Sequence, residues 1–186
     1  MPFFKSMPDD AGPANVFTAQ PDIFGPWSAM SQVLMNGPSP LTPGEREMIA
    51  AYVVGVAGCE FAYVAHCEAA YAWGIEDGTI DRLLESLDAA APKFRPLFAF
   101  VKKLTLNPGA MDQADADAVF DAGWNEKALG DAIAVTARMC FMQRLVEGHG
   151  FTQMPRDKAR QNARKRVDLG YVDLYPEFAD RSQDGK

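Results

Sequence analysis

Apolar residues recur at steps of three and four along most of the chain, which is the spacing of one face of a helix. Two stretches, residues 41–73 and 125–147, are so rich in apolar side chains that more than one face of each helix would be apolar. No stretch of useful length alternates between apolar and polar residues as a half-buried strand does. The pattern therefore predicts an all-α fold.

The first apolar stretch is expected to form two helices. Thr42 and Glu45 have the spacing of a capping box, and Pro43 suits the first position of a helix. Two glycines near the end of this helix weaken it by about 1 kcal/mol each relative to alanine, so a break is expected just before Cys59. A second helix then runs from Cys59 to Trp73, where a glycine ends it.

The rest of the chain divides at its prolines and glycines. The first 26 residues contain five prolines, so we expect an extended arm that packs across its own domain or a neighbour. Further helices are expected over residues 27–35, 77–87, 92–107, 112–122 and 125–147, followed by a basic segment over 156–166 and an apolar segment over 171–178 that packs against the domain.

We predict one domain with an extra segment at each end, because 186 residues are enough for a single core. The expected division is an N-terminal arm and short helix over 1–40, a helical core over 41–150, and a basic helix and tail over 151–186. A hydrophobic share of 48% with 23% charged residues is typical of a globular protein.

Charge and cysteine content argue against several classes of function. A net charge of −7 argues against general nucleic-acid binding. The apolar run 48–67 is long enough to span a bilayer, but it contains Glu60, His66 and two glycines, so we expect no membrane insertion. Three cysteines and the lack of a signal-peptide pattern after Met1 indicate a reduced, cytoplasmic protein.

Candidate chemistry lies in the first apolar stretch, where Glu47, Cys59 and His66 interrupt the apolar run. Such groups are costly to bury without partners, so they indicate either a chemical role or a satisfied hydrogen bond. Cys59 is expected in the first turn of its helix, where the helix dipole favours the thiolate. His66 lies about 10 Å further along the axis, too far for a direct hydrogen bond. We expect no cofactor, and these three residues lack the spacing of a zinc site.

The same residues resemble the core motif of the carboxymuconolactone decarboxylase and alkylhydroperoxidase D-like (AhpD-like) superfamily, in its peroxidase-related branch. In that motif a Glu is followed by Cys-x-x-Cys-x-x-x-His, and here Glu47 is followed by Cys59, Ala62 and His66. The resemblance covers about residues 41–150. It implies an AhpD-like helical bundle of six to eight helices that forms a homo-oligomer.

The sequence departs from the motif at Ala62, which replaces the second cysteine. A disulfide across one helical turn therefore cannot form there. Cys67 lies about 12 Å from Cys59 along the helix axis, beyond the reach of a disulfide. An oxidised Cys59 would need a small thiol reductant or a thiol from another element, and the sequence leaves open whether Cys140 faces the site.

Three functions remain as alternatives from this resemblance. The first is an antioxidant oxidoreductase that reduces a small hydroperoxide through Cys59, with Glu47 and His66 relaying protons. The second is a decarboxylase-like lyase or isomerase that acts on an organic acid through Glu47 and His66. The third is a non-catalytic oligomeric binding protein on the same scaffold.

Two basic features also allow more than one interpretation. Arg138 and Arg144 interrupt the helix over 125–147. Either one of them neutralises Glu47 or an anionic substrate, or both are surface or structurally paired side chains. The basic segment 156–166 either binds an anion or a neighbouring subunit, or is a solvated helix face.

Overall fold

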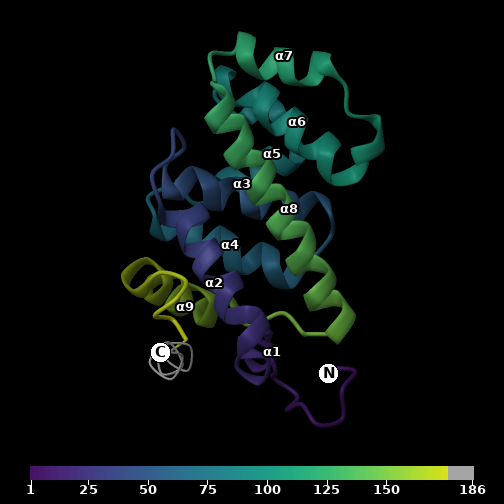
Figure 1. Ribbon diagram of the computed structural model, residues 1–186, viewed down its shortest axis with the longest axis vertical. Coiled ribbons are helices and arrows are strands. Elements are labelled where there is room, and N and C mark those ends of the chain that lie inside the picture. The colour runs from purple at the N-terminus through teal and green to yellow at the C-terminus, as the bar shows by residue number, and fades with distance from the viewer. Residues whose placement is uncertain (176–186) are drawn as a thin grey trace.

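The computed structural model describes residues 1–175, which form nine α-helices and three short 3₁₀ helices without a strand (Figure 1). The predicted all-α fold is confirmed. In chain order the helices are α1 (Pro13–Ala19), α2 (Pro21–Asn36), α3 (Pro43–Val56), α4 (Glu60–Ala72), α5 (Thr79–Glu85), α6 (Arg95–Leu106), α7 (Gln113–Asp121), α8 (Glu126–His149) and α9 (Arg156–Leu169).

Helices α3 and α4 form the centre of the fold. The capping box at the start of α3 is present, because Thr42 and Glu45 each accept a hydrogen bond from the other's backbone N–H, at 3.2 and 2.7 Å. Every residue from Arg46 to Val54 is buried. The chain leaves the helix through Gly58, whose φ of 76° lies in the left-handed region that favours glycine. The predicted break between the two helices is therefore confirmed.

The other long helices enclose this central pair. Helix α8 packs against α3 and α6, while α9 packs along α4. Helix α2 contacts both α3 and α8. In Figure 1, α6 and α7 lie at one end of the molecule, and α1 and the N-terminal arm lie at the other. Side chains of α3 and α4 thus meet α2, α8 and α9 in the interior.

The expectation of an extended arm over the first 26 residues is wrong from Pro13 onward. Pro13 and Pro21 occupy the first turn of α1 and α2, where a backbone N–H has no partner within the helix, so these prolines favour helix initiation. Of the first 26 residues, only residues 1–12 and Gln20 lie outside the helices. Residues 1–12 pack across their own domain, as expected, with the N–H of Phe3 donating to the carbonyl of His149 at 2.9 Å.

The later helices begin and end close to their predicted positions. The helix predicted over 27–35 is the C-terminal part of α2, and the basic segment 156–166 lies within α9. At the start of α8, the side chain of Asn125 accepts a hydrogen bond from the N–H of Ala128 at 2.9 Å. At its end, Gly150 adopts a φ of 67°. A capping side chain and a glycine therefore determine where α8 begins and ends.

The segments on either side of residues 41–150 pack onto that core. Helices α2 and α9 contact α3 and α4, respectively. In the apolar segment 171–178, Tyr171 is buried as expected, and residues 176–178 lie outside the described residues. The division into three segments stays a prediction.

Several large apolar side chains remain exposed on the outer faces of α2 and α8. They are Ile23, Met30 and Val33 on α2, and Ile133 and Phe141 on α8. An interface with a second copy would cover them, and oligomerisation stays a prediction. Within residues 1–175, no helix combines the length and hydropathy that crossing a bilayer requires.

Helix α9 is joined to the core by a buried carboxylate. Glu68 of α4 is 2% exposed, and it accepts hydrogen bonds from Arg156 at 2.5 Å and from Arg160 at 3.0 Å. Both arginines are about half exposed, so they also keep contact with solvent. Two of the basic residues in α9 therefore have a structural role, since a buried carboxylate needs such partners.

We predict that Glu68→Gln loosens α9. Glutamine keeps the volume of the side chain but removes its charge, and the loss of charge-assisted hydrogen bonds should reduce the free energy of unfolding by about 1–3 kcal/mol. Urea denaturation would measure this, and trypsin should cut within α9 faster than in the wild type. The matched control is Glu60→Gln on the same helix, where the residue is exposed. Unchanged trypsin cleavage in Glu68→Gln would contradict the role of Glu68.

Candidate functional site

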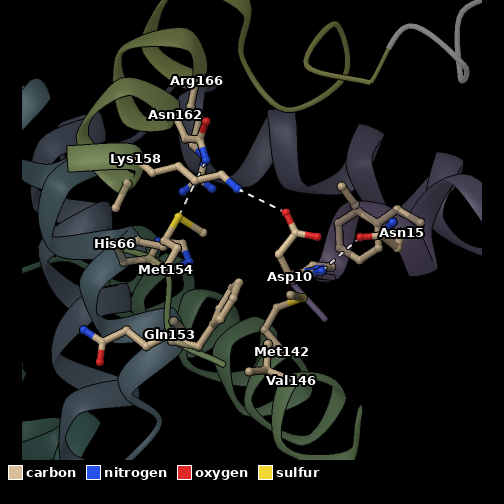
Figure 2. A pocket seen from close by; sticks show the side chains of 18 of the residues that line it. Asp10, Asn15, His66, Met142, Val146, Gln153, Met154, Lys158, Asn162 and Arg166 are labelled. Carbon is tan, nitrogen blue, oxygen red and sulfur yellow. Dashed lines mark hydrogen bonds and ion pairs between the residues drawn. The ribbon is translucent and has the colours of Figure 1, made fainter. Parts of the chain in front are cut away.

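A pocket of about 860 Å³ lies between the N-terminal arm and helices α1, α4, α8 and α9 (Figure 2). Helix α4 contributes His66 and Ala62 to its wall, α8 contributes Arg138 and Met142, and α9 contributes Arg166. This volume is in the range of pockets that bind small organic molecules. The pocket is therefore the candidate site.

Glu47 holds His66 in the wall of this pocket. Atom Nδ1 of His66 lies 2.6 Å from Oε2 of Glu47, and both side chains are buried. Glu47 comes from α3 and His66 from α4, and these two helices pack directly against each other. Two of the three predicted site residues are thus in direct contact.

Tyr171 is a third member of this group, which the sequence analysis did not single out. Its hydroxyl donates to Oε1 of Glu47 at 2.5 Å, so both oxygens of the carboxylate are hydrogen-bonded. Tyr171 is 124 residues away from Glu47 along the chain and follows α9. The apolar character of segment 171–178 was the signal that placed it in the interior, but nothing in the sequence indicated its partner.

Glu47 is ionised at neutral pH. Burial by itself would raise the pKa of this carboxyl group, but the contact with His66, the charge of Arg166 and the hydroxyl of Tyr171 outweigh burial and lower the pKa to about 2. An ionised carboxylate accepts hydrogen bonds and donates none. Glu47 is therefore a fixed acceptor for both of its neighbours.

His66 is neutral at neutral pH. Burial lowers its pKa, Arg166 and Arg138 lower it further, and Glu47 acts in the opposite direction. A neutral ring beside an ionised carboxylate must carry its proton on Nδ1, because the carboxylate only accepts. Nε2 then carries the lone pair. Since His66 lines the pocket, Nε2 is the nitrogen that a bound ligand can reach.

Cys59, the third predicted site residue, lies apart from the pocket. It is the residue immediately before α4, one position ahead of the predicted helix start, and it is fully buried and does not line the pocket. Burial raises the pKa of its thiol to about 12, Glu147 raises it too, and the backbone N–H of Ala62 acts in the opposite direction. Burial outweighs the N–H at the helix N-terminus, which favours the thiolate, so the pKa of Cys59 is raised rather than lowered. A catalytic role for Cys59 stays a prediction.

The other two thiols, Cys67 and Cys140, do not line the pocket either. Burial raises the pKa of Cys67 to about 12, and Cys140 is partly exposed. All three cysteines are unpaired, and none lines the pocket. By contrast Ala62, which occupies the position of the second motif cysteine, does line the pocket one turn before His66. The substitution therefore leaves the pocket without a thiol.

The two arginines of α8 have different surroundings. Arg138 is buried in the pocket wall, whereas Arg144 is exposed and bonds the carbonyl of Cys140 at 2.8 Å. The interpretation in which an arginine neutralises Glu47 or an anionic ligand thus fits Arg138, and Arg144 is a surface side chain. No group of three His, Cys, Asp or Glu side chains within residues 1–175 is arranged to hold a metal ion.

Comparison with known proteins shows the fold. No protein-family model and no curated protein sequence matches the chain. An uncharacterized peroxidase-related protein from Silicibacter sp. TM1040 is 23% identical, with a TM-score of 0.71 over 79% of this chain and 77% of that chain. The alkylhydroperoxidase AhpD core of an uncharacterized peroxidase-related protein from Ralstonia eutropha JMP134 is 24% identical, with a TM-score of 0.71 over 80% and 78%. The expected AhpD-like helical fold is confirmed.

We predict that Glu47→Gln destabilises the protein strongly at pH 7. The substitution removes the buried negative charge that faces Arg138 and Arg166, and breaking a buried charge pair on one side typically costs about 3–5 kcal/mol. Chemical denaturation followed by circular dichroism would measure the loss. Glu85→Gln, at an exposed position in α5, should change the free energy of unfolding by less than about 0.5 kcal/mol. Equal stability of the two variants would contradict an ionised Glu47.

Proposed function

We propose that the protein is an enzyme of the AhpD-like fold that catalyses proton transfer on a small molecule, as a lyase or isomerase does, with His66 as the proton carrier. The observation that supports this best is the position of His66. Its ring lines the pocket, while its Nδ1 is held 2.6 Å from a fully buried Glu47. None of the three cysteines lines the pocket, so acid–base chemistry is favoured over thiol chemistry.

In this mechanism neutral His66 accepts a proton from the ligand at Nε2. The positively charged ring that results lies beside Glu47, whose carboxylate stabilises it through the shared Nδ1–H. Tyr171 bonds the other carboxylate oxygen, so Glu47 keeps its orientation while the charge on His66 changes. The same nitrogen then returns the proton to another atom of the ligand.

Hydroperoxide reduction is the second candidate function. It is favoured by the position of Cys59 directly before α4 and by the two solved structures of this fold, which are described as peroxidase-related. A Cys59 thiolate would attack the terminal peroxide oxygen and break the O–O bond, giving a sulfenic acid and an alkoxide that takes a proton to become the alcohol. Two thiols of a reductant would then restore the Cys59 thiol, forming a disulfide and releasing water. This route requires the buried thiol to become accessible and ionised. A reduced cytoplasmic location, which suits such a thiol, stays a prediction.

We predict that His66→Gln abolishes proton transfer while Cys59→Ala preserves it. Glutamine can still donate a hydrogen bond to Glu47 but cannot carry a proton, so the rate should fall by about 10²- to 10⁴-fold. Proton NMR in D₂O would follow isomerisation, decarboxylation or deuterium uptake of a panel of carboxylated lactones.

The pH profile provides an independent check of the same residue. Because burial lowers the pKa of His66, the wild-type rate should stay constant as the pH falls past about 6.5, the ordinary histidine value. It should decrease only at lower pH, where His66 becomes protonated and can no longer accept a proton.

Peroxide turnover decides between the two candidates. Wild type and Cys59→Ala would be assayed with cumene hydroperoxide and dithiothreitol. Turnover that depends on Cys59, together with no proton transfer on any lactone, would contradict acid–base catalysis and support hydroperoxide reduction. Ligand binding without either activity would instead support a non-catalytic binding protein.

A further inference from the structure

Cationic side chains gather where α8 and α9 line the pocket. They are Arg138 from α8 and Lys158, Lys165 and Arg166 from α9. Figure 2 shows Arg166 and Lys158 on one side of the pocket and Met142 and Val146 on another. Lys158 lies 3.9 Å from Asp10 of the N-terminal arm, and both side chains are largely exposed, so this pair contributes little. Within residues 1–175, Arg138 and Arg166 share Glu47 as an acidic neighbour.

Arg138 is fixed by packing rather than by a carboxylate. Its guanidinium lies over the ring of Trp27 at 4.7 Å and over the ring of Tyr171 at 4.8 Å. Its Nε donates to the hydroxyl of Ser31 at 3.0 Å. The side chain is only 5% exposed, so a positive charge is held in a defined place in the pocket wall.

Arg166 has donors that no described residue accepts. Its Nε and Nη1 atoms are buried and have no hydrogen-bond partner within residues 1–175. The guanidinium lies 5.2 Å from the centre of the Tyr171 ring, and the side chain lines the pocket. Buried donors are rarely left without an acceptor, and each such case needs an explanation.

The positive and negative charges around Glu47 do not balance. Glu47 supplies one negative charge, and both of its oxygens are already bonded, to His66 and to Tyr171. Arg138 and Arg166 supply two positive charges, and both act electrostatically on Glu47 and on His66. Since His66 is neutral, one positive charge in the inner wall of the pocket is left without a counter-charge among these residues. An anion in the pocket would provide it.

We propose that Arg138 and Arg166 form an anion-binding subsite, and that the ligand of the pocket is an organic carboxylate with a largely apolar body. The carboxylate head group of the ligand would lie against Arg138 and Arg166. The body would lie against buried apolar side chains that also line the pocket, Phe61, Met142 and Val146. This names the substrate class of the acid–base reaction proposed above, and its catalytic part rests on that proposal.

Calorimetric titration of the full chain with 2-naphthoate tests the subsite directly. The neutral probe 2-naphthamide has nearly the same shape without the charge, and acetate has the head group without the apolar body. We expect naphthoate to bind at least about tenfold more tightly than either probe, because a charge-assisted hydrogen bond at a buried site is worth that much or more. Equal binding of naphthoate and naphthamide, or no naphthoate binding up to about 10 mM, would overturn the proposal.

Variants of α9 assign the effect to Arg166. Arg166→Gln should weaken naphthoate binding at least about tenfold, while Arg166→Lys, which keeps the charge, should weaken it less. Arg164→Gln is the matched control, since Arg164 is exposed on the same helix and does not line the pocket. Thermal melting of each variant shows whether it is folded. Equal affinity in Arg164→Gln and a folded Arg166→Gln would assign binding elsewhere and overturn the proposal.

The subsite and the acid–base function can fail separately. His66→Gln should still bind naphthoate, because the head group contacts the arginines rather than the ring. Naphthoate binding that depends on Arg166, without proton transfer on any substrate, would support the anion-binding subsite and contradict the catalytic role of His66. Proton transfer confined to uncharged substrates would support the acid–base function and contradict the anion-binding subsite.

Discussion

The buried carboxylate of Glu47 is the interaction on which the site depends. A carboxylate cannot stay ionised in an interior without partners, and Glu47 obtains its two hydrogen bonds from two other parts of the chain, His66 of the next helix α4 and Tyr171 after α9, 124 residues away. Arg138 and Arg166 add their charges. The group therefore links the central helices to α8 and to the C-terminal segment, and it determines the protonation of His66.

This arrangement separates the two chemistries that the sequence motif suggested. His66, the proposed proton carrier, lines the pocket, whereas Cys59 is fully buried, does not line the pocket, and has the pKa of its thiol raised by burial. Ala62, at the position where the motif has its second cysteine, is the residue that reaches the pocket beside His66. The pocket wall thus contains His66, with Glu47 hydrogen-bonded to it from α3, and none of the three cysteines. Arg138 and Arg166 form part of the remaining surface of the pocket.

Most helices could be anticipated because they depend on local signals, and one motif was enough to single out Glu47 and His66 as candidate site residues, though not the hydrogen bond between them. Capping residues, glycines and apolar spacing fix where a helix begins and ends. Helix α1 and the first residues of α2 were not predicted, because prolines usually interrupt helices, although Pro13 and Pro21 occupy first-turn positions. The contact of Tyr171 with Glu47, and the donors of Arg166 that have no partner within residues 1–175, could not be anticipated, since they result from long-range packing of the C-terminal part of the chain.

The protonation state of His66 tests the central claim most directly. Nitrogen-15 NMR of the imidazole distinguishes the two neutral forms and the charged form of each histidine, and comparison with His66→Gln assigns the signals. The account predicts that at pH 7 His66 is neutral with its proton on Nδ1, because Nδ1 faces the ionised Glu47. A proton on Nε2, or a charged ring at pH 7, would contradict it.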